Sequence, residues 1–225
     1  MRNLLQDLSN CKSVVFDCDG VILQSNKIKT NAFRESLKGD PIVLIDQFIE
    51  YHKSNGGISR YVKFEYYYQY IKCEKNYKTL SKKAISRYSE IVVEGLIAAD
   101  YIPGVINAIN YFNDKNIPCF VISGGDQIEL NEVFSKRGID NSFVEILGSP
   151  ITKKEHAVEM VKIDQIKLPG IFFGDAYLDM EVANFIGLDF IFIHGYSEWA
   201  NGLNIAIKED LYFYKDFIEV FSGNV

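Results

Sequence analysis

Two aspartates separated by one residue carry the clearest chemical signal in this chain. The β-branched and aromatic run Val14–Phe16 is followed directly by Asp17-Cys18-Asp19-Gly20. The run predicts a strand that stops at Asp17, and two carboxylates this close repel each other unless a bound cation draws them together. Such a strand tip could carry a nucleophile, a metal ligand and an acid/base group. The alternative is an ordinary Asp-Gly turn, since both residues favour turns.

Polar residues with related chemistry follow later apolar runs. The runs at 118–122, 144–147, 171–173 and 190–193 each end in glycine and polar residues. These endings supply the hydroxyl of Ser123, the ammonium of Lys153 or Lys154, and the carboxylates of Asp175 and Asp179. In an open α/β sheet, ligands bind beyond the carboxyl ends of the strands, so these side chains should meet on one rim.

The elements that position this rim are predicted from the same apolar runs. Continuous apolar runs suit buried parallel strands, and helical patterns at 105–116, 127–136, 154–161 and 178–185 fill the gaps between them. The alternation predicts an α/β fold with a Rossmann-like, doubly wound parallel sheet.

The segment between the first two strands breaks this rhythm. Residues 24–99 contain no convincing parallel strand, and the stretches 31–37, 43–53, 61–71 and 81–97 all have helical patterns. We therefore predict a core domain from residues 1–23 and 100–225, with a helical cap domain, 24–99, inserted into it. The tyrosines at 61, 66–68 and 70 are expected to pack between cap helices.

Composition and charge limit the classes of partner. The formal charge is −6, and 225 residues are enough for one large domain or for a core with an insertion. Nucleic-acid binders need excess Lys and Arg, so we expect no nucleic acid. No apolar run approaches the roughly 20 residues that span a bilayer, and residues 1–12 do not resemble a signal peptide. We expect no membrane contact and a cytoplasmic location.

The set of rim residues suits phosphoryl transfer. An aspartate nucleophile is repelled by a phosphoester unless cations screen it, and hard oxygen ligands such as Asp17 and Asp175 suit Mg²⁺. A lysine and a serine hydroxyl can hold other phosphate oxygens. An aspartyl-phosphate would divide one difficult step into two, and Asp19 could protonate the leaving oxygen and then deprotonate water.

Four ordered motifs make the chain resemble the haloacid dehalogenase-like hydrolase superfamily, in its helical-cap type. They are Asp17-Cys18-Asp19-Gly20-Val21, Ser123-Gly124-Gly125, Lys153 and Gly174-Asp175-Ala176-Tyr177-Leu178-Asp179. The resemblance implies a Mg²⁺ cofactor and a mobile cap. It also implies Asp17 as nucleophile and metal ligand, and Asp19 as acid/base and as a metal ligand through its carbonyl. Asp175 would bind the metal, and Asp179 would hold a metal-bound water or orient the lysine.

The resemblance further implies that Ser123 and the Gly124 N–H bind the phosphoryl group and that Lys153 neutralises it. Lys154 stays open as the alternative lysine. Ser123 could instead cap the next helix, and Asp179 could be an acid of a first helical turn.

The loop 55–60 of the cap is similar to a substrate-binding loop of β-phosphoglucomutase relatives, which makes Arg60 a candidate for a distal anionic group. Lys27 and Lys29 are further candidates. An ordinary surface arginine at a helix start is the other interpretation of Arg60.

The resulting hypothesis is a Mg²⁺-dependent phosphatase that acts on a small phosphorylated metabolite, such as a sugar phosphate, through an aspartyl-phosphate. A β-phosphoglucomutase-like phosphomutase is the first alternative, although residues 27–31 lack the histidine of the mutase relatives. A non-catalytic domain that binds a phosphorylated ligand or a partner is the second. Asp19 favours phosphate over halide chemistry, because relatives that cleave carbon–halogen bonds lack this acid. Substrate identity and the choice between monomer and dimer stay open.

Overall fold

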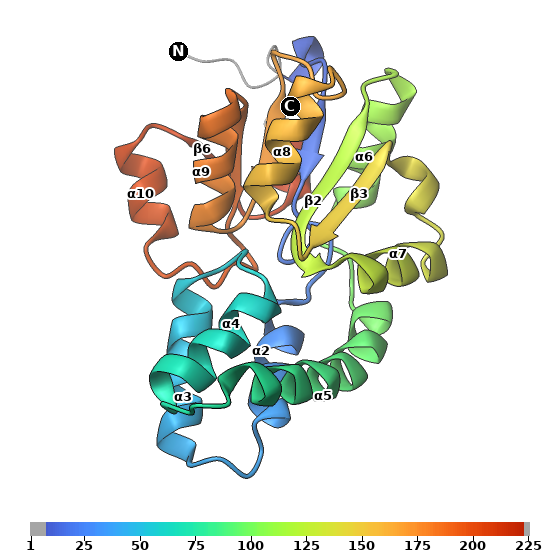
Figure 1. The fold of residues 1–225 in the computed structure, drawn as a ribbon. Coiled ribbons are helices and arrows are strands. Elements are labelled where there is room, and N and C mark those ends of the chain that lie inside the picture. The colour runs from blue at the N-terminus through green and yellow to red at the C-terminus, as the bar shows by residue number, and fades with distance from the viewer. Residues whose placement is uncertain (1–7, 223–225) are drawn as a thin grey trace.

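A six-stranded parallel sheet forms the centre of the molecule (Figure 1). The computed structural model describes residues 8–222. The strand order is β3-β2-β1-β4-β5-β6, and every neighbouring pair is parallel. The predicted doubly wound α/β fold is therefore confirmed. The strands are β1 Val14–Phe16, β2 Cys119–Asp126, β3 Glu145–Ser149, β4 Ile171–Gly174, β5 Asp189–Ile193 and β6 Tyr212–Tyr214.

Alternating strand residues bury both faces of the sheet. Val14 and Phe16 belong to one apolar cluster, and Val15 belongs to the other, as the two-residue period of a strand requires. The first cluster includes residues of α6 (Val105–Asp114), α7 (Gln127–Lys136) and α11 (Phe217–Ser222). The second includes residues of α8 (Lys153–Lys162), α9 (Tyr177–Ile186) and α10 (Gly202–Lys208). A short 3₁₀ turn, Asp140–Ser142, precedes β3.

Between β1 and α6 the chain forms helices that add no strand to the sheet. They are α2 (Asn26–Ser36), α3 (Ile42–Ser54), α4 (Arg60–Tyr66) and α5 (Tyr77–Ala98), and a π-helical turn, Tyr67–Ile71, extends α4. We call these helices and their connections the cap. In Figure 1 the arrowheads of β2 and β3 point toward the cap, so the cap covers the carboxyl ends of the strands.

An aromatic cluster holds the cap together. Phe33, Phe48, Phe64 and Tyr88 are buried, and the rings of Phe33 and Phe64 each contact the other three. The expected packing of the tyrosines is confirmed for Tyr67 and Tyr68, which are 0% and 6% exposed, whereas Tyr70 is 62% exposed.

The C-terminal part of the sheet differs from the prediction. Strand β6 and helices α10 and α11 have no counterpart in the sequence pattern, because β6 is partly exposed at the sheet edge, unlike the equally short but fully buried β1, and both helices are short. Strand β2 runs to Asp126, beyond the predicted end at residue 122.

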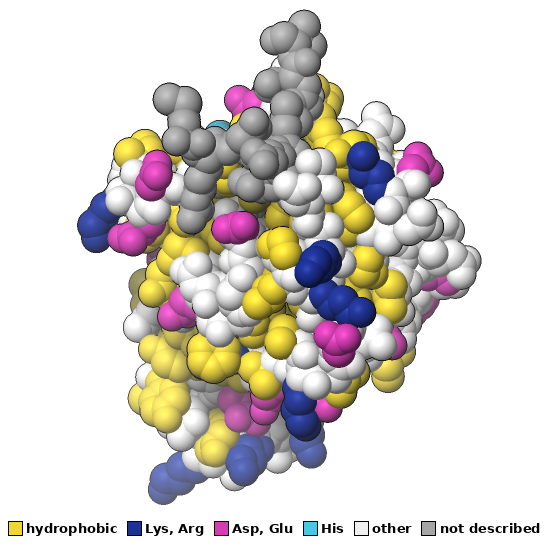
Figure 2. All heavy atoms as spheres, turned by 90° about the horizontal axis from the view of Figure 1, so that it is seen from above, with side chains coloured by type: hydrophobic (Ala, Val, Ile, Leu, Met, Phe, Trp, Pro, Cys, Tyr) yellow, Lys and Arg dark blue, Asp and Glu magenta, His cyan; other side chains and the backbone are white. Residues whose placement is uncertain are grey.

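On the core face turned away from the cap, acidic, basic and apolar side chains are intermixed (Figure 2). Within residues 8–222, no helix combines the length and apolar character that crossing a membrane requires.

Candidate active site

The predicted carboxylates meet at the ends of two adjacent strands. Asp17 directly follows β1, and its N–H donates to the Phe173 carbonyl of β4, the strand that leads to Asp175. Asp179 lies in the first turn of α9. Oxygen atoms of Asp17, Asp175 and Asp179 lie within 4.8 Å of one another, and all three residues are buried. Parallel neighbours with matched register thus bring together residues that are more than 150 positions apart.

Lys153 is the lysine that joins this cluster. Its Nζ lies 2.7 Å from Asp17 Oδ1 and 2.6 Å from Asp179 Oδ1, and the side chain is 1% exposed. Thr152 caps α8 through a capping box with Glu155, which fixes Lys153 at the first helical position. Lys154 is exposed, and its ammonium lies over the Phe185 ring. The geometry therefore places Lys153, and not Lys154, beside the carboxylates.

Asp179 uses both carboxylate oxygens within the protein. Oδ1 accepts from Lys153, and Oδ2 accepts from the backbone N–H groups of Asp175 and Ala176. This arrangement supports the expected role of orienting Lys153 more than that of a direct metal ligand.

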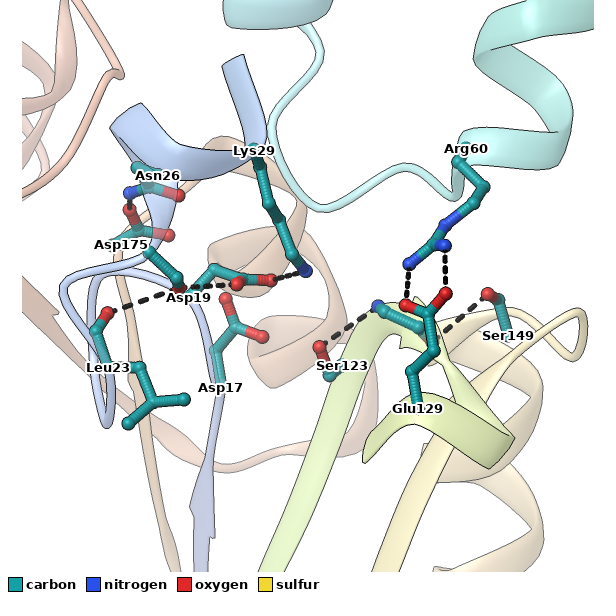
Figure 3. Close-up of polar contacts among 12 residues, drawn as sticks. Asp17, Asp19, Leu23, Asn26, Lys29, Arg60, Ser123, Glu129, Ser149 and Asp175 are labelled. Atoms are coloured by element: carbon teal, nitrogen blue, oxygen red, sulfur yellow. Dashed lines mark hydrogen bonds and ion pairs between the residues drawn. The ribbon is translucent and has the colours of Figure 1, made fainter. Parts of the chain in front are cut away.

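Asp19 is held by residues at the start of the cap (Figure 3). Ser25 Oγ donates to its Oδ1 at 2.5 Å, and Lys29 of α2 forms an ion pair with Oδ2. Burial acts to raise the pKa of Asp19, but the Lys29 ammonium and the Ser25 hydroxyl outweigh it and hold the pKa below the usual value. Asp19 is thereby kept as a carboxylate. Lys29 was a secondary candidate in the sequence, while Lys27 is exposed.

The surroundings of the Asp17 carboxylate would stabilise a cation bound next to it. Burial, with the nearby Asp179 and Asp19, raises the pKa of Asp17 to about 7, although Lys153 opposes the shift. The Lys153 contact satisfies the distance for an ion pair but not the direction of a hydrogen bond, so Asp17 Oδ1 is buried with no hydrogen-bond partner. Burial likewise raises the pKa of Asp175 well above its usual value.

These residues fit a divalent cation. Three buried carboxylates face one lysine, and one carboxylate oxygen lacks a hydrogen-bond partner. An ion among them would offset the surplus negative charge, and carboxylate oxygens are the ligands that Mg²⁺ prefers.

Asn26, the first residue of α2, supports Asp175 from the cap side. Its Nδ2 donates to Asp175 Oδ2 at 2.6 Å and to the Tyr196 carbonyl at 2.9 Å. Gly20 permits this close packing, because a Cβ there would lie 2.3 Å from Asp175 Oδ2, and its φ of +74° also favours glycine. Ser197 Oγ donates to the Asp175 carbonyl, which fixes the backbone at this point.

The Ser123 motif lies on β2, the strand next to β1. Ser123 is completely buried, and its Oγ accepts from the Gly125 N–H at 3.0 Å. Gly124 and Gly125 line the cavity beside Asp17, but Ser123 does not. A Cβ on Gly124 would lie 2.1 Å from the Gly57 carbonyl oxygen, so the cap loop rests directly on the core at this position. Asp126 caps α7, because its side chain accepts from the N–H groups of Ile128 and Glu129.

A cavity of about 280 Å³ lies between the cap and the carboxylates. Arg60 lines it, but both terminal guanidinium nitrogens donate to the Glu129 carboxylate of α7, and one also donates to Ser89 (Figure 3). The Arg60 and Glu129 side chains are 3% and 9% exposed. Arg60 therefore joins the cap to the core, and it is not among the groups gathered around Asp17.

Several residues of the site have no counterpart in the sequence-based prediction. Asn26, Lys63, His52 and Glu198 line the same cavity, and Glu129 binds Arg60. The partners of Asn26 and Arg60 lie 149 and 69 positions away in the sequence, so no local pattern indicates these contacts.

Comparison with solved structures shows proteins of the same fold. A predicted phosphoglycolate phosphatase from Haemophilus somnus is 18% identical, with a TM-score of 0.70, and the match covers 96% of this chain and 98% of that one. A haloacid dehalogenase-like hydrolase from Streptococcus pneumoniae is 20% identical, with a TM-score of 0.69 and coverage of 94% and 97%. A β-phosphoglucomutase from Clostridium difficile is 16% identical, with a TM-score of 0.69 and coverage of 92% of each chain. At these identities the likeness shows the fold alone.

The family comparison uses the sequence itself. Among curated proteins, no sequence matches this chain. The model of the family described as haloacid dehalogenase-like hydrolase matches residues 14–193, a stretch that begins at β1 and ends with β5. This stretch includes Asp17, Asp19, Asp175, Asp179, Lys153 and the whole cap. The chain therefore belongs to the haloacid dehalogenase-like hydrolase family.

Proposed function

We propose that this chain is a Mg²⁺-dependent phosphatase that hydrolyses a small phosphorylated metabolite through an aspartyl-phosphate. The observation that carries the proposal is the buried Asp17 carboxylate, which borders the cavity and lies 2.7 Å from Lys153. A carboxylate in this position can act as a nucleophile while an ammonium holds the incoming phosphate oxygens.

The chemistry requires one carboxylate to attack and another to move protons. A carboxylate oxygen of Asp17 bonds to phosphorus while the bond from phosphorus to the ester oxygen breaks. Asp19, which rests as a carboxylate beside Lys29, first takes up a proton from solvent, and the leaving oxygen then takes this proton from the Asp19 carboxyl group. Asp19 then takes a proton from water as that water attacks phosphorus, which releases inorganic phosphate and restores Asp17.

The ion pair between Asp19 and Lys29 fits the second half of this cycle. A base that activates water must begin as a carboxylate, and Lys29 keeps Asp19 in that form. Because Lys29 belongs to the cap, the position of the cap relative to the core would influence the protonation of Asp19.

Asp17, Asp175 and the carbonyl of Asp19 would hold Mg²⁺, with Asp179 behind them. When bound, the ion would neutralise negative charge between the nucleophile and the phosphate. Asn26, at the start of the cap, fixes the orientation of the Asp175 carboxylate by its hydrogen bond to Oδ2.

Lys153, Ser123 and Gly124 are the proposed contacts of the phosphoryl group, and residues 24–99 are the proposed cap domain. Lys153 supplies charge, and the β2 end supplies hydroxyl and backbone donors. We leave Arg60 out of the substrate contacts, because Glu129 occupies its guanidinium group.

Phosphate release from a panel of phosphorylated metabolites, with and without Mg²⁺, tests the proposal. The wild-type protein should release phosphate only with Mg²⁺, and Asp17→Asn should abolish the release. Full activity of Asp17→Asn would refute the mechanism. A hexose 1-phosphate supplied with a bisphosphate activator separates the mutase alternative, since a mutase would give an isomerised sugar phosphate without free phosphate.

A further inference from the structure

Lys63 of α4 is a buried ammonium group without a carboxylate partner. It is 3% exposed and lines the same cavity as Asp17. Lys29, Arg60 and Lys153 also lie in or beside the cavity, and each forms an ion pair with a carboxylate. Among the described residues, no Asp or Glu oxygen lies within ion-pair distance of Lys63, whose contacts are to His52. A buried charge without a counter-charge is costly, so an anion from outside would complete this site.

The geometry of Lys63 leaves one donor free. Nζ lies 2.8 Å from His52 Nδ1 and 3.3 Å from the His52 carbonyl oxygen. An ammonium has three N–H donors, and the third has no partner in the part of the chain that the structure describes. The Phe33 ring lies 5.7 Å from Nζ and closes one side of the ammonium group.

A chain of hydrogen bonds fixes the ammonium in place. An ammonium can only donate, so when Lys63 is charged it donates to Nδ1 of His52 and the ring proton is on Nε2, which lies 3.0 Å from Thr30 Oγ1. The Thr30 hydroxyl then donates to Glu198 Oε2 at 2.8 Å. Burial, with the nearby Lys63 and Lys29, lowers the pKa of His52 well below its usual value, so the ring adds no charge. His52, Thr30 and Glu198 therefore position Lys63 without neutralising it directly.

The protonation of Lys63 agrees with a missing anion. Burial, and then the Lys29 ammonium, lower the pKa of Lys63 to about 7, and the more distant Asp19 and Glu198 do not compensate. An anion in contact with Nζ would favour the charged form.

We infer that Lys63 is the specificity-determining residue of the cap and that it binds a carboxylate at the end of the substrate remote from the phosphoryl group. The inference rests on the proposed function, which places the phosphoryl group at Asp17, and it gives Lys63 the part that the sequence pattern offered to Arg60. The substrate is then a small phosphorylated carboxylic acid.

The cavity favours a monoanion over a second phosphate. Lys63 offers one free donor, and the carboxylates of Glu181 and Glu198 line the same cavity. These two acids would repel a dianion more strongly than a carboxylate.

Calorimetric binding of two matched phosphonates, in the presence of Mg²⁺, tests the inference without requiring turnover. The probes are 2-carboxyethylphosphonate and propylphosphonate, which differ by a carboxylate in place of a methyl group. The wild-type protein should bind the carboxylate compound at least about tenfold more tightly, since a charge-assisted hydrogen bond contributes that much or more. In Lys63→Met the ratio of the two affinities should fall to near one.

Three further variants separate a direct contact from a general effect. Lys53 lines the mouth of the same cavity but is exposed, so Lys53→Met should keep the wild-type ratio. Thr30→Val breaks the hydrogen-bond chain without touching Lys63 and should give an intermediate ratio. Circular dichroism of each variant checks that the fold is intact, and Lys63→Arg, which restores the charge, should recover part of the preference.

The outcomes also separate this inference from the proposed function. Equal wild-type affinities for both probes, no binding of either, or a preference that persists in Lys63→Met would overturn the inference, even if phosphatase activity is present. A preference that depends on Lys63, in a protein that releases no phosphate from any ester, would support the inference and refute the proposed function.

Discussion

The Arg60–Glu129 pair connects the cap to the core, and breaking it should open the cap. Arg60 begins α4 in the cap, Glu129 lies in the first turn of α7 in the core, and both side chains are almost completely buried. Changing either residue to Gln leaves the other charge buried without its partner. Opening of the cap would hydrate the remaining charge, so we expect Arg60→Gln and Glu129→Gln each to increase the open population.

The size of the increase in the open population follows from the burial of the ion pair and from its two parallel hydrogen bonds. Removing one partner of a buried ion pair costs about 3–5 kcal/mol. Since about 1.4 kcal/mol is a factor of ten, the lower value corresponds to about a hundredfold increase in the open population. The double variant Arg60→Gln/Glu129→Gln leaves no buried charge, and its open population should stay within about tenfold of the wild type.

Hydrogen exchange of the cap loop, residues 54–59, measures this opening directly. Gly57 of this loop rests on Gly124, so the loop is protected only while the cap is closed. Arg34→Gln is the matched control, because the Arg34–Asp46 pair lies within the cap and is 40% and 56% exposed. Exposed pairs contribute about 0–1 kcal/mol, so exchange should barely change in this variant. Unchanged exchange in the single variants, or additive effects in the double variant, would refute the reasoning.

Three further predictions concern the residues around Asp17, Asp19 and Gly124. Replacing Lys29 by Met removes the main group that lowers the pKa of Asp19, so the Asp19 carboxyl ¹³C resonance should titrate at a higher pH than in the wild type; an unchanged or lower midpoint would contradict this. Asp17 has a raised pKa of about 7 and must lose its proton to bind a cation. The Mg²⁺ affinity measured by calorimetry should therefore be weaker at pH 6 than at pH 8, by up to about tenfold per pH unit below 7. An affinity independent of pH would contradict this. Gly124→Ala places a methyl group against the Gly57 carbonyl, so phosphate release should fall at least about tenfold while the circular dichroism spectrum stays native. Wild-type activity of this variant would contradict the prediction, because it would show that the cap loop moves aside without loss of function.

The sequence predicted the parts of this molecule that depend on local pattern. Apolar runs that stop at a polar residue identify β1 and β4, and the parallel sheet then brings Asp17 and Asp175 to one edge. The choice between Lys153 and Lys154 needed the structure, because only the direction of the first turn of α8 decides which ammonium faces Asp17.

The cap contacts could not be predicted in the same way. Arg60 stands in a loop pattern that indicates substrate binding, but the acid that binds it, Glu129, belongs to α7 and has no distinctive neighbours in the sequence. Lys63 carries no motif, and its importance comes from burial and from the absence of a carboxylate in reach among residues 8–222. Strand β6 is partly exposed at the sheet edge, so it lacks the buried apolar run that identifies the equally short β1.

The most direct test of the central claim is to trap the covalent intermediate on Asp17. The protein would be mixed with Mg²⁺ and a ³²P-labelled phosphomonoester that it hydrolyses, quenched in acid within one turnover, digested and analysed by mass spectrometry. The proposed function predicts hydroxylamine-labile label on the peptide that contains Asp17, and none in Asp17→Asn. Turnover without label on this peptide, or label on a serine or histidine instead, would contradict it.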